Sequence, residues 1–150
     1  MKWGDIMQKV LECSSKGDKR FSAFYARIKL FGEYDSIENH YQLSKRINSF
    51  APKTWRDIKG KKPTHIHING KDYNLKYTVA FYELMWVKYL DENPNLVEYG
   101  KQFENFHDMF QSKNAKVCQA DVIRDYVKKG REYILDNHKD FIKLMKENKK

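Results

Sequence analysis

The spacing of hydrophobic residues changes along the chain and predicts a mixture of helices and strands. Residues 5–13 place apolar side chains at helical intervals, which predicts a short first helix. Residues 24–31 are rich in aromatic and β-branched side chains and alternate in polarity, which predicts a strand. Residues 64–77 contain two alternating halves joined by Asn69-Gly70, the strongest short-range hairpin signal. We expect one small antiparallel sheet made from the 24–31 strand and the 64–77 hairpin.

The second half of the chain is predicted to be mostly helical. Almost every residue from 78 to 90 is apolar or aromatic, which is typical of a helix that is packed on most of its circumference. A short helix is predicted from Pro94 to Tyr99, and from about Val117 the chain is again helical, with a break near Gly130. The predicted fold class is therefore α+β: a mainly helical single domain with a small antiparallel β-sheet.

A helix predicted over residues 36–50 gathers chemically different polar groups on one side. At 100° per residue, one sector of this helix contains Glu38, Tyr41, Gln42 and Lys45. Such a cluster can simply be the solvent-exposed face of an amphipathic helix, with no role in function. An acid, a phenol, an amide and an amine in one sector can also meet a single small ligand, because a carboxylate can transfer protons and a lysine with a lowered pKa can attack an aldehyde carbon. In that case Glu38, Gln42 and Lys45 are expected to line a concavity with Tyr41 at its edge.

Length and composition favour one folded domain. The chain has 150 residues, of which 41% are hydrophobic, so we expect a single domain over residues 1–150 with its own core. Cys13 and Cys118 are far apart and have no metal-ligand or redox spacing, which predicts a reducing compartment and no disulfide framework. No segment approaches the roughly 18 apolar residues of a membrane span, and no apolar signal segment precedes Asp5. We therefore expect a cytoplasmic protein without a membrane partner.

An excess of basic residues favours anionic partners. The chain has 29 Lys and Arg against 20 Asp and Glu, a net charge of +9, which attracts nucleic acid, nucleotides and pyrophosphates. Part of the excess lies in the run 59–62, which can equally serve solubility. The loop 53–63 has few apolar anchors and is expected to be mobile or poorly packed. A plain nucleic-acid-binding domain is one interpretation, and it requires exposed aromatic and lysine side chains away from Lys45.

Other candidate sites have simpler explanations. His65 and His67 share one face of a predicted strand, but no third ligand has a useful spacing, so no metal is expected. Asp121 and Arg124 are three residues apart on a helix and predict a surface ion pair. The chain contains no P-loop, no dinucleotide-binding glycine pattern and no nucleophile elbow.

Four segments resemble the NADAR family, in the order that the family has them. Residues 21–25, FSAFY, are similar to an opening FSNFY motif, and residues 36–45, SIENHYQLSK, match S-[VI]-E-x-x-[YF]-Q-x-x-K at every fixed position. Residues 83–96, ELMWVKYLDENPNL, look like the central helix of that family. Residues 114–130, NAKVCQADVIRDYVKKG, look like its closing segment. The chain is therefore identified as a divergent NADAR-like protein.

The resemblance implies an N-glycosidase that cleaves the bond between a ribose carbon and a base. The leading substrate class is ADP-ribosylated guanine in DNA or RNA, and pyrimidine intermediates of riboflavin synthesis are the other known one. Lys45 would attack the sugar C1 and hold it as a Schiff base, while Glu38 would position a ribose hydroxyl or move protons, without any metal or cofactor. The sequence carries no signal for an oligomeric state. The substrate-binding residues expected on this basis are Arg20, Phe21, Ser22, Tyr41, Gln42, Trp86, Asp108 and Gln119.

The sequence departs from the NADAR pattern at three places. Ala23 replaces the usual asparagine, residues 103–111, FENFHDMFQ, stand where the family has a tryptophan-glycine motif, and residues 117–120, VCQA, replace a glycine-leucine pair. Asp108-Met109-Phe110 and Gln119-Ala120 resemble a D-x-F and a Q-A pair of other NADAR-like proteins. These departures favour the alternative of a catalytically inactive NADAR-like module that binds a nucleotide, nucleic acid or a partner protein.

Overall fold

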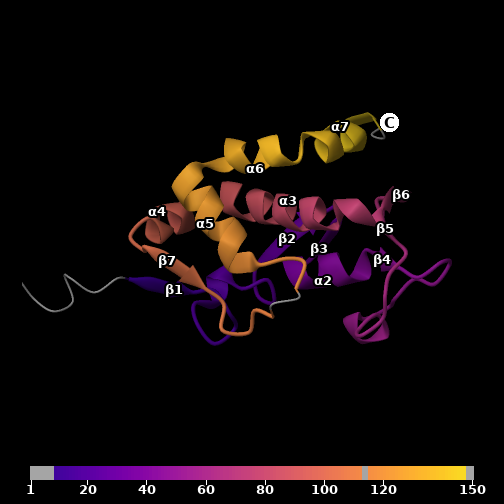
Figure 1. The fold of residues 1–150 in the computed structure, drawn as a ribbon, viewed down its shortest axis with the longest axis horizontal. Helices are drawn as coiled ribbons and strands as arrows, with labels where there is room; N and C mark the ends of the chain where they lie inside the picture. Colours follow the sequence, from indigo (N-terminus) through magenta and orange to yellow (C-terminus); the bar gives the residue numbers. More distant parts are fainter. Residues whose placement is uncertain (1–8, 113–114, 148–150) are drawn as a thin grey trace, which may run out of the picture.

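Helix α3 (Thr78–Asp91) lies at the centre of the computed structural model, which describes residues 9–112 and 115–147 (Figure 1). Helices α6 (Arg131–Asn137) and α7 (Lys139–Glu147) lie along one side of α3, and α2 (Ile37–Leu43) lies on the other. Most of the side chains of α3 are buried, as the sequence predicted, and Trp86 is 0% exposed. With several small, mostly antiparallel sheets, this arrangement confirms the α+β fold class.

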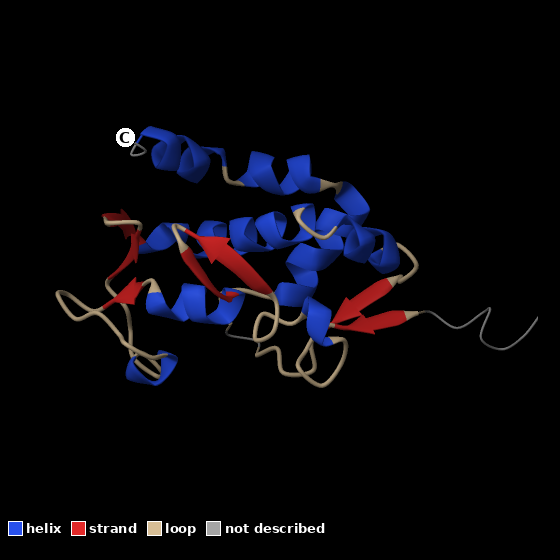
Figure 2. Ribbon diagram, turned by 180° about the vertical axis from the view of Figure 1, so that it is seen from behind, coloured by secondary structure: helices blue, strands red, loops and turns tan. Residues whose placement is uncertain are grey.

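In the described residues the strands form three separate small sheets. The β2 strand (Arg27–Leu30) pairs with β3 (Glu33–Ser36), and this hairpin lies on the side of α3 that faces the viewer in Figure 2. In the second sheet β5 (His65–Ile68) lies between β6 (Lys71–Asn74) and the short β4 (Lys45–Arg46). Every pair in these two sheets is antiparallel.

The prediction of one sheet is therefore wrong in its pairing. The chain turns back at Phe31-Gly32, where both residues have positive φ (49° and 88°), so residues 24–31 pair with the strand that follows directly. Closing this short loop costs less conformational entropy than pairing with the distant 64–77 hairpin. That hairpin itself forms as predicted, since Asn69 and Gly70 have φ of 50° and 81°.

Residues 10–12 form a strand where the sequence predicted part of a helix. The β1 strand (Val10–Glu12) pairs in parallel with β7 (Asn105–His107) in the third sheet. Residues 5–8 of the predicted helix lie outside the described residues. The apolar spacing of residues 5–13 is a weak preference, and pairing with the distant β7 strand overrides it.

Helix α2 is shorter than the predicted helix over residues 36–50. It begins as predicted, since the Ser36 hydroxyl accepts a hydrogen bond from the Asn39 backbone N (3.1 Å). It ends at Ser44, whose hydroxyl donates to the Tyr41 carbonyl (2.7 Å). Lys45 therefore lies at the start of β4, one residue beyond the helical cap.

The remaining helices lie in the segments that were predicted to be helical. They are α4 (Pro94–Gly100), α5 (Gln119–Lys129), α6 and α7. Gly130, with φ of 95°, separates α5 from α6 as expected. A second break, which the sequence did not predict, occurs at His138 between α6 and α7.

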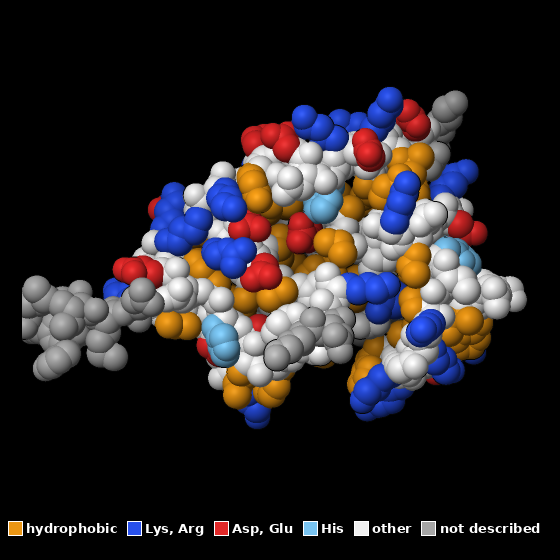
Figure 3. Space-filling view, in the orientation of Figure 1, with side chains coloured by type: hydrophobic (Ala, Val, Ile, Leu, Met, Phe, Trp, Pro, Cys, Tyr) orange, Lys and Arg blue, Asp and Glu red, His pale blue; other side chains and the backbone are white. Residues whose placement is uncertain are grey.

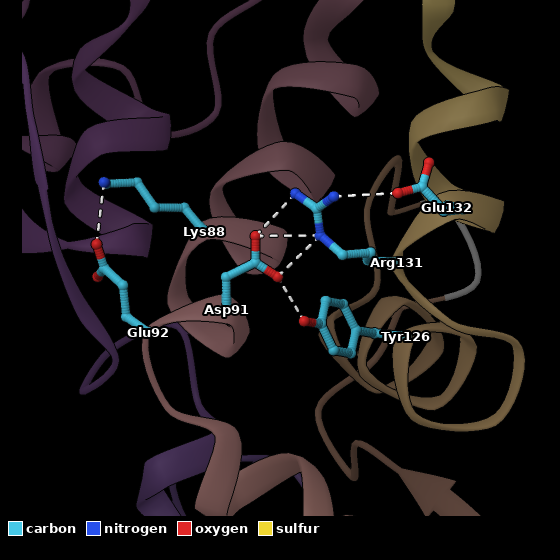
Figure 4. Close-up of polar contacts among 6 residues, drawn as sticks. All are labelled: Lys88, Asp91, Glu92, Tyr126, Arg131 and Glu132. Carbon is cyan, nitrogen blue, oxygen red and sulfur yellow. Dashed lines mark hydrogen bonds and ion pairs between the residues drawn. The ribbon is translucent and has the colours of Figure 1, made fainter.

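One carboxylate connects the end of α3 to α5 and α6 (Figure 4). Asp91 accepts hydrogen bonds from the Tyr126 hydroxyl and from the guanidinium of Arg131 (Nη2–Oδ2, 2.9 Å). Arg131 also reaches Glu132 (3.1 Å), and Lys88 pairs with Glu92 one turn away on α3. These side chains are partly exposed, so each ion pair contributes less than about 1 kcal/mol. The bonds that Asp91 makes join the end of α3 to α5 through Tyr126 and to α6 through Arg131.

The loop over residues 53–63 is largely exposed, as expected, but it is anchored. It contains one short turn, η2 (Trp55–Asp57), in which the Asp57 carboxylate accepts from the backbone N of Lys53 (2.9 Å) and Thr54 (3.1 Å). Ile58 is only 3% exposed. The loop that was expected to be mobile or poorly packed therefore has an apolar anchor that was not predicted from the sequence.

Most of the buried apolar side chains make one hydrophobic cluster, which includes Tyr82 and Trp86. Cys13 and Cys118 are both free thiols. Over the two described stretches of chain, no helix has the length and hydrophobicity that crossing a membrane requires.

Glu12 stabilises the junction between β1 and the segment after β7. Its carboxylate accepts from His107 Nδ1 (2.6 Å) and from the Met109 backbone N (2.9 Å). Desolvation opposes ionisation, but these hydrogen bonds and those from Ser14 hold the pKa of Glu12 at about 2, against an ordinary 4.5. The ionised carboxylate therefore contributes stability above pH 4.5, and this contribution is lost as the pH falls toward 2.

We predict that Glu12→Gln lowers the free energy of unfolding by about 2 kcal/mol at pH 7. The difference from the unsubstituted protein should shrink between pH 4.5 and 2, because the acid form of Glu12 loses the same interactions. Urea denaturation across this pH range measures both effects. The control is Glu104→Gln, which changes an exposed glutamate directly before β7, the strand that pairs with β1. An equal loss in both variants would show that the Glu12 hydrogen bonds do not stabilise the fold.

Candidate functional site

The four polar residues predicted as a site gather where α2 meets β4. The Lys45 ammonium lies 4.4 Å from the centroid of the Tyr41 ring. The Gln42 amide donates to Glu38 Oε1 (3.3 Å), one turn earlier on the helix. Tyr41 is buried, and the other three side chains are half-buried. The helix ends before Lys45, yet the strand that follows returns this side chain to the same cluster.

Burial controls the protonation of Lys45 and Glu38. Desolvation lowers the pKa of Lys45, and the positive charge of Lys116 lowers it further, while Glu38 opposes both effects. Desolvation also raises the pKa of Glu38, against the Gln42 hydrogen bond and the charge of Lys45. Burial therefore outweighs the attraction between the two groups, and both are shifted toward their neutral forms.

Arg46, the neighbour of Lys45 in sequence, points its guanidinium elsewhere. It donates to the carbonyl oxygens of Leu43 (2.6 Å) and Lys45 (3.0 Å). The cation that disfavours the Lys45 ammonium comes instead from Lys116, far along the chain.

A cavity of about 480 Å³ opens beside Lys45. Tyr41 and Lys45 face it, as predicted, whereas Glu38 and Gln42 are not among its lining residues. The lining comes from α2, β4, the loop before β5, the start of α3 and the segment before α5: Tyr41, Lys45, Lys61, Lys62, Pro63, Leu75, Thr78 and Lys116. A concavity is thus present with Tyr41 and Lys45 on its wall, but the prediction that Glu38 and Gln42 also line it is wrong, because their side chains bond to each other along α2.

The backbone of Ala23 connects α2 to two of the predicted binding residues. Its carbonyl accepts from the Glu38 backbone N (3.0 Å), and its own N donates to Gln119 Oε1 (2.7 Å). The other end of the Gln119 amide donates to Asp108 Oδ2 (2.9 Å). Gln119 is only 7% exposed. Glu38, Asp108 and Gln119 are therefore joined through Ala23, although they lie far apart in the sequence.

Aromatic rings of α3 support the cluster from inside. Tyr82 meets the Tyr41 ring edge-on, with centroids 5.1 Å apart. Burial raises the pKa of Tyr82 and keeps its phenol neutral. Trp86, a predicted binding residue, is completely buried and packs at 90° against Tyr89. In this structure Trp86 therefore shapes the core, and its role in binding stays a prediction.

The other predicted binding residues lie toward α4. Phe21 and Ser22 are completely buried, and Phe21 stacks on Tyr99 with centroids 6.1 Å apart. Arg20 is exposed, pairs with Asp18 (2.6 Å) and lies 4.7 Å above the Tyr99 ring. Their roles in substrate binding also stay predictions.

His65 and His67 both face Asp72 rather than open solvent. Asp72 Oδ1 lies 2.6 Å from His67 Nδ1 and 3.5 Å from His65 Nε2. In the parts of the chain that the structure describes, no three His, Cys, Asp or Glu side chains are grouped so that they could hold a metal.

Sequence analysis missed three lysines of the cavity wall. Lys61 and Lys62 belong to the basic run 59–62, which was attributed in part to solubility, and Lys116 had no motif of its own. The basic run was a usable signal. Its meeting with Lys116 depends on the tertiary fold and was not visible in the sequence.

In a comparison with protein families, residues 3–150 match the model of the DarT1-associated NADAR antitoxin. The chain belongs to this family. The match confirms the NADAR resemblance across nearly the whole chain, and NADAR proteins are in general N-glycosidase-like. No curated protein matches the chain.

For this NADAR protein we predict that Gln119→Leu lowers the free energy of unfolding by about 2 kcal/mol, because it leaves the buried Ala23 N–H without an acceptor. Gln119→Glu should cost more, since it adds a carboxylate beside Asp108. Thermal and urea unfolding measure the loss. Gln102→Leu, at an exposed position, should change stability by less than about 0.5 kcal/mol. Similar values for Gln102→Leu and Gln119→Leu would contradict the structural role of this amide.

Proposed function

We propose that this protein is an N-glycosidase that removes ADP-ribose from guanine in nucleic acid, through a single NADAR-like domain over residues 1–150. The observation that carries the proposal is a half-buried Lys45 with a lowered pKa at the wall of a cavity, beside a Glu38 with a raised pKa. Family membership supports the N-glycosidase class. An antitoxin also suits an activity that reverses a modification.

The proposed reaction uses the Lys45 amine as the nucleophile. Its nitrogen bonds to the ribose C1 as the bond between C1 and the guanine nitrogen breaks, and the electron pair of that bond goes to the base. The bond between C1 and the ring oxygen then opens to give a Schiff base. Water adds at C1, the bond to lysine breaks, and ADP-ribose and the free amine are released. One water is consumed, and no carbon is oxidised or reduced.

Glu38 suits proton transfer in this scheme. Burial raises its pKa and so favours the acid form, which can give a proton to the departing base or donate to a ribose hydroxyl. Gln42 orients the carboxyl through its amide. Tyr41 lies under the ammonium and would face the sugar at the cavity wall. Asp108 and Gln119 would support the site indirectly, by holding the Ala23 backbone that bonds to Glu38 at the start of α2.

Ala23 favours the second candidate, an inactive NADAR-like binding module. The position carries a methyl group instead of the amide that is usual in the family. Both backbone polar groups of Ala23 are already used, by Gln119 and by Glu38. A direct assay of turnover separates the enzyme from the binding module.

We predict that Lys45→Ala and Lys45→Arg both abolish glycosidase turnover and keep the fold, because neither alanine nor a permanently protonated guanidinium can attack C1. Chromatography of the unmodified guanine nucleotide and of the ADP-ribose released from an ADP-ribosylated guanine nucleotide measures turnover. Borohydride should trap the sugar on Lys45, which mass spectrometry detects. The control is Lys29→Arg, at an exposed position on β2. Full activity in Lys45→Arg would exclude Schiff-base chemistry at this residue.

We predict that Glu38→Gln lowers kcat with less effect on ligand binding and shifts the pH dependence. The Glu38 carboxylate stabilises the Lys45 ammonium, so its removal lowers the pKa of Lys45 further. The amine is then available at lower pH, and the rising limb of kcat/KM against pH should move to lower pH. A rising limb that stays in place or moves upward would show that Glu38 does not act on the protonation of Lys45.

A further inference from the structure

Exposed rings and cations alternate on the segment between β4 and β5. Trp55 is 37% exposed, and the Arg56 guanidinium and the Lys59 ammonium lie 5.1 and 5.3 Å from its ring centroid. Phe50 is 44% exposed and has the Lys61 ammonium 5.5 Å from its centroid. Aromatic faces with adjacent cations are the elements from which single-stranded nucleic-acid sites are built.

The same segment contributes cations to the Lys45 cavity. Lys61 and Lys62 line the cavity from the loop before β5, and Lys116 lines it from the segment before α5. All three side chains are exposed. Because they come from two separate segments, a phosphate chain that crosses the cavity mouth would contact lysines of both.

The charge of this surface is almost entirely of one sign. Residues 47–64 contain five lysines and arginines and a single acid, Asp57. The Asp57 carboxylate is occupied by the backbone N–H groups of Lys53 and Thr54. Figure 3 shows basic and hydrophobic side chains interleaved on the lobe that this segment forms at the lower right, beside a hollow. Such a surface suits a polyanion better than a protein of mixed charge.

The segment is held in place before any ligand binds. The η2 turn is capped by Asp57, Ile58 is buried, and the Asn48 backbone N donates to the Thr64 hydroxyl oxygen (2.9 Å). A surface that is already ordered loses less entropy on binding than a flexible loop does.

We propose that this lobe is a binding surface for single-stranded nucleic acid next to the site. Lys61, Lys62 and Lys116 contact backbone phosphates on both sides of the base that enters the cavity, and Trp55 and Phe50 stack on neighbouring bases. The Trp55 ring and its two cations are not part of the cavity lining. A nucleic-acid strand that extends beyond the cavity can therefore contact them, whereas the pyrophosphate of ADP-ribose inside the cavity alone does not account for them. A single strand fits better than a duplex, since paired bases offer no free face to Trp55 and cannot reach a half-buried amine. The proposal rests on the proposed function for the identity of that base.

The test is binding of a fluorescently labelled, unmodified single-stranded DNA, measured by anisotropy at several salt concentrations. The variant Lys61→Ala/Lys62→Ala/Lys116→Ala should bind at least about tenfold more weakly, and the slope of log K against log salt should fall by about 2, or 0.7 per lost phosphate contact. Trp55→Ala should weaken binding about tenfold without a change in slope. The matched control, Lys139→Ala/Lys143→Ala/Lys146→Ala on α7, removes the same charge and should bind nearly as the unsubstituted protein does.

Three results would overturn the proposal. Equal losses in the two triple variants would indicate non-specific attraction. Equal binding of a duplex of the same sequence, with Trp55→Ala without effect, would exclude stacking on unpaired bases. A loss of affinity for free ADP-ribose alone would assign the three lysines to the pyrophosphate. Thermal unfolding of each variant confirms that it is folded.

The same experiment separates this inference from the proposed function. The DNA is unmodified, so binding does not require turnover. If the unmodified DNA binds as expected and no ADP-ribosylated base is hydrolysed, the proposed glycosidase activity is excluded and the proposed binding surface is supported. If a ribosylated mononucleotide is hydrolysed and the DNA does not bind, the surface alone is excluded.

Discussion

The end of α2 at Ser44 determines where the candidate nucleophile lies. Ser44 turns its hydroxyl back to the Tyr41 carbonyl, and its own carbonyl accepts from the His67 backbone N (2.7 Å), so the chain leaves the helix and joins β5. Lys45 is then paired in register with Ile66, a fully buried residue. Strand pairing fixes the Lys45 backbone while its side chain lies over Tyr41. A reactive amine held on paired backbone is better oriented than one on a free loop.

The electrostatics of the site follow from this placement. In open solvent Lys45 and Glu38 would each keep their charge. Half-buried between α2, β4 and α3, both lose hydration, and both pKa values move toward the neutral forms. Lys116 adds to the effect on Lys45 from across the cavity. A cavity edged with lysines thus serves two purposes in the proposed function: it attracts phosphate and it disfavours one further positive charge at the nucleophile.

The sequence predicted the parts of the fold that depend on local signals. The apolar run of α3, the Asn69-Gly70 turn and the Ser36 cap each specify a structure within a few residues. The paired strands β1 and β4 were missed because their partners are distant in the sequence, and an apolar spacing that suits a helix is a weak preference against such pairing. The cluster of Glu38, Tyr41, Gln42 and Lys45 was predicted from helical spacing, although the helix ends before Lys45 and a strand brings this residue to the cluster. Its cavity also needs Lys116, which only the tertiary fold brings to the site.

The three departures from the NADAR pattern prove to be parts of one network. Ala23, Asp108 and Gln119 stand in three separate motifs, yet the Gln119 amide bonds to the Ala23 backbone and to the Asp108 carboxylate. An alanine at position 23 has no side-chain amide, and the Gln119 amide lies against its backbone N–H. Through the Ala23 carbonyl the network reaches the first turn of α2 at Glu38, and the Met109 backbone bonds to Glu12 on β1. Loss of the Gln119 amide alone would leave the buried Ala23 N–H without its acceptor and Asp108 Oδ2 without this donor, so Gln119 is the residue that joins the three motifs into one structural unit.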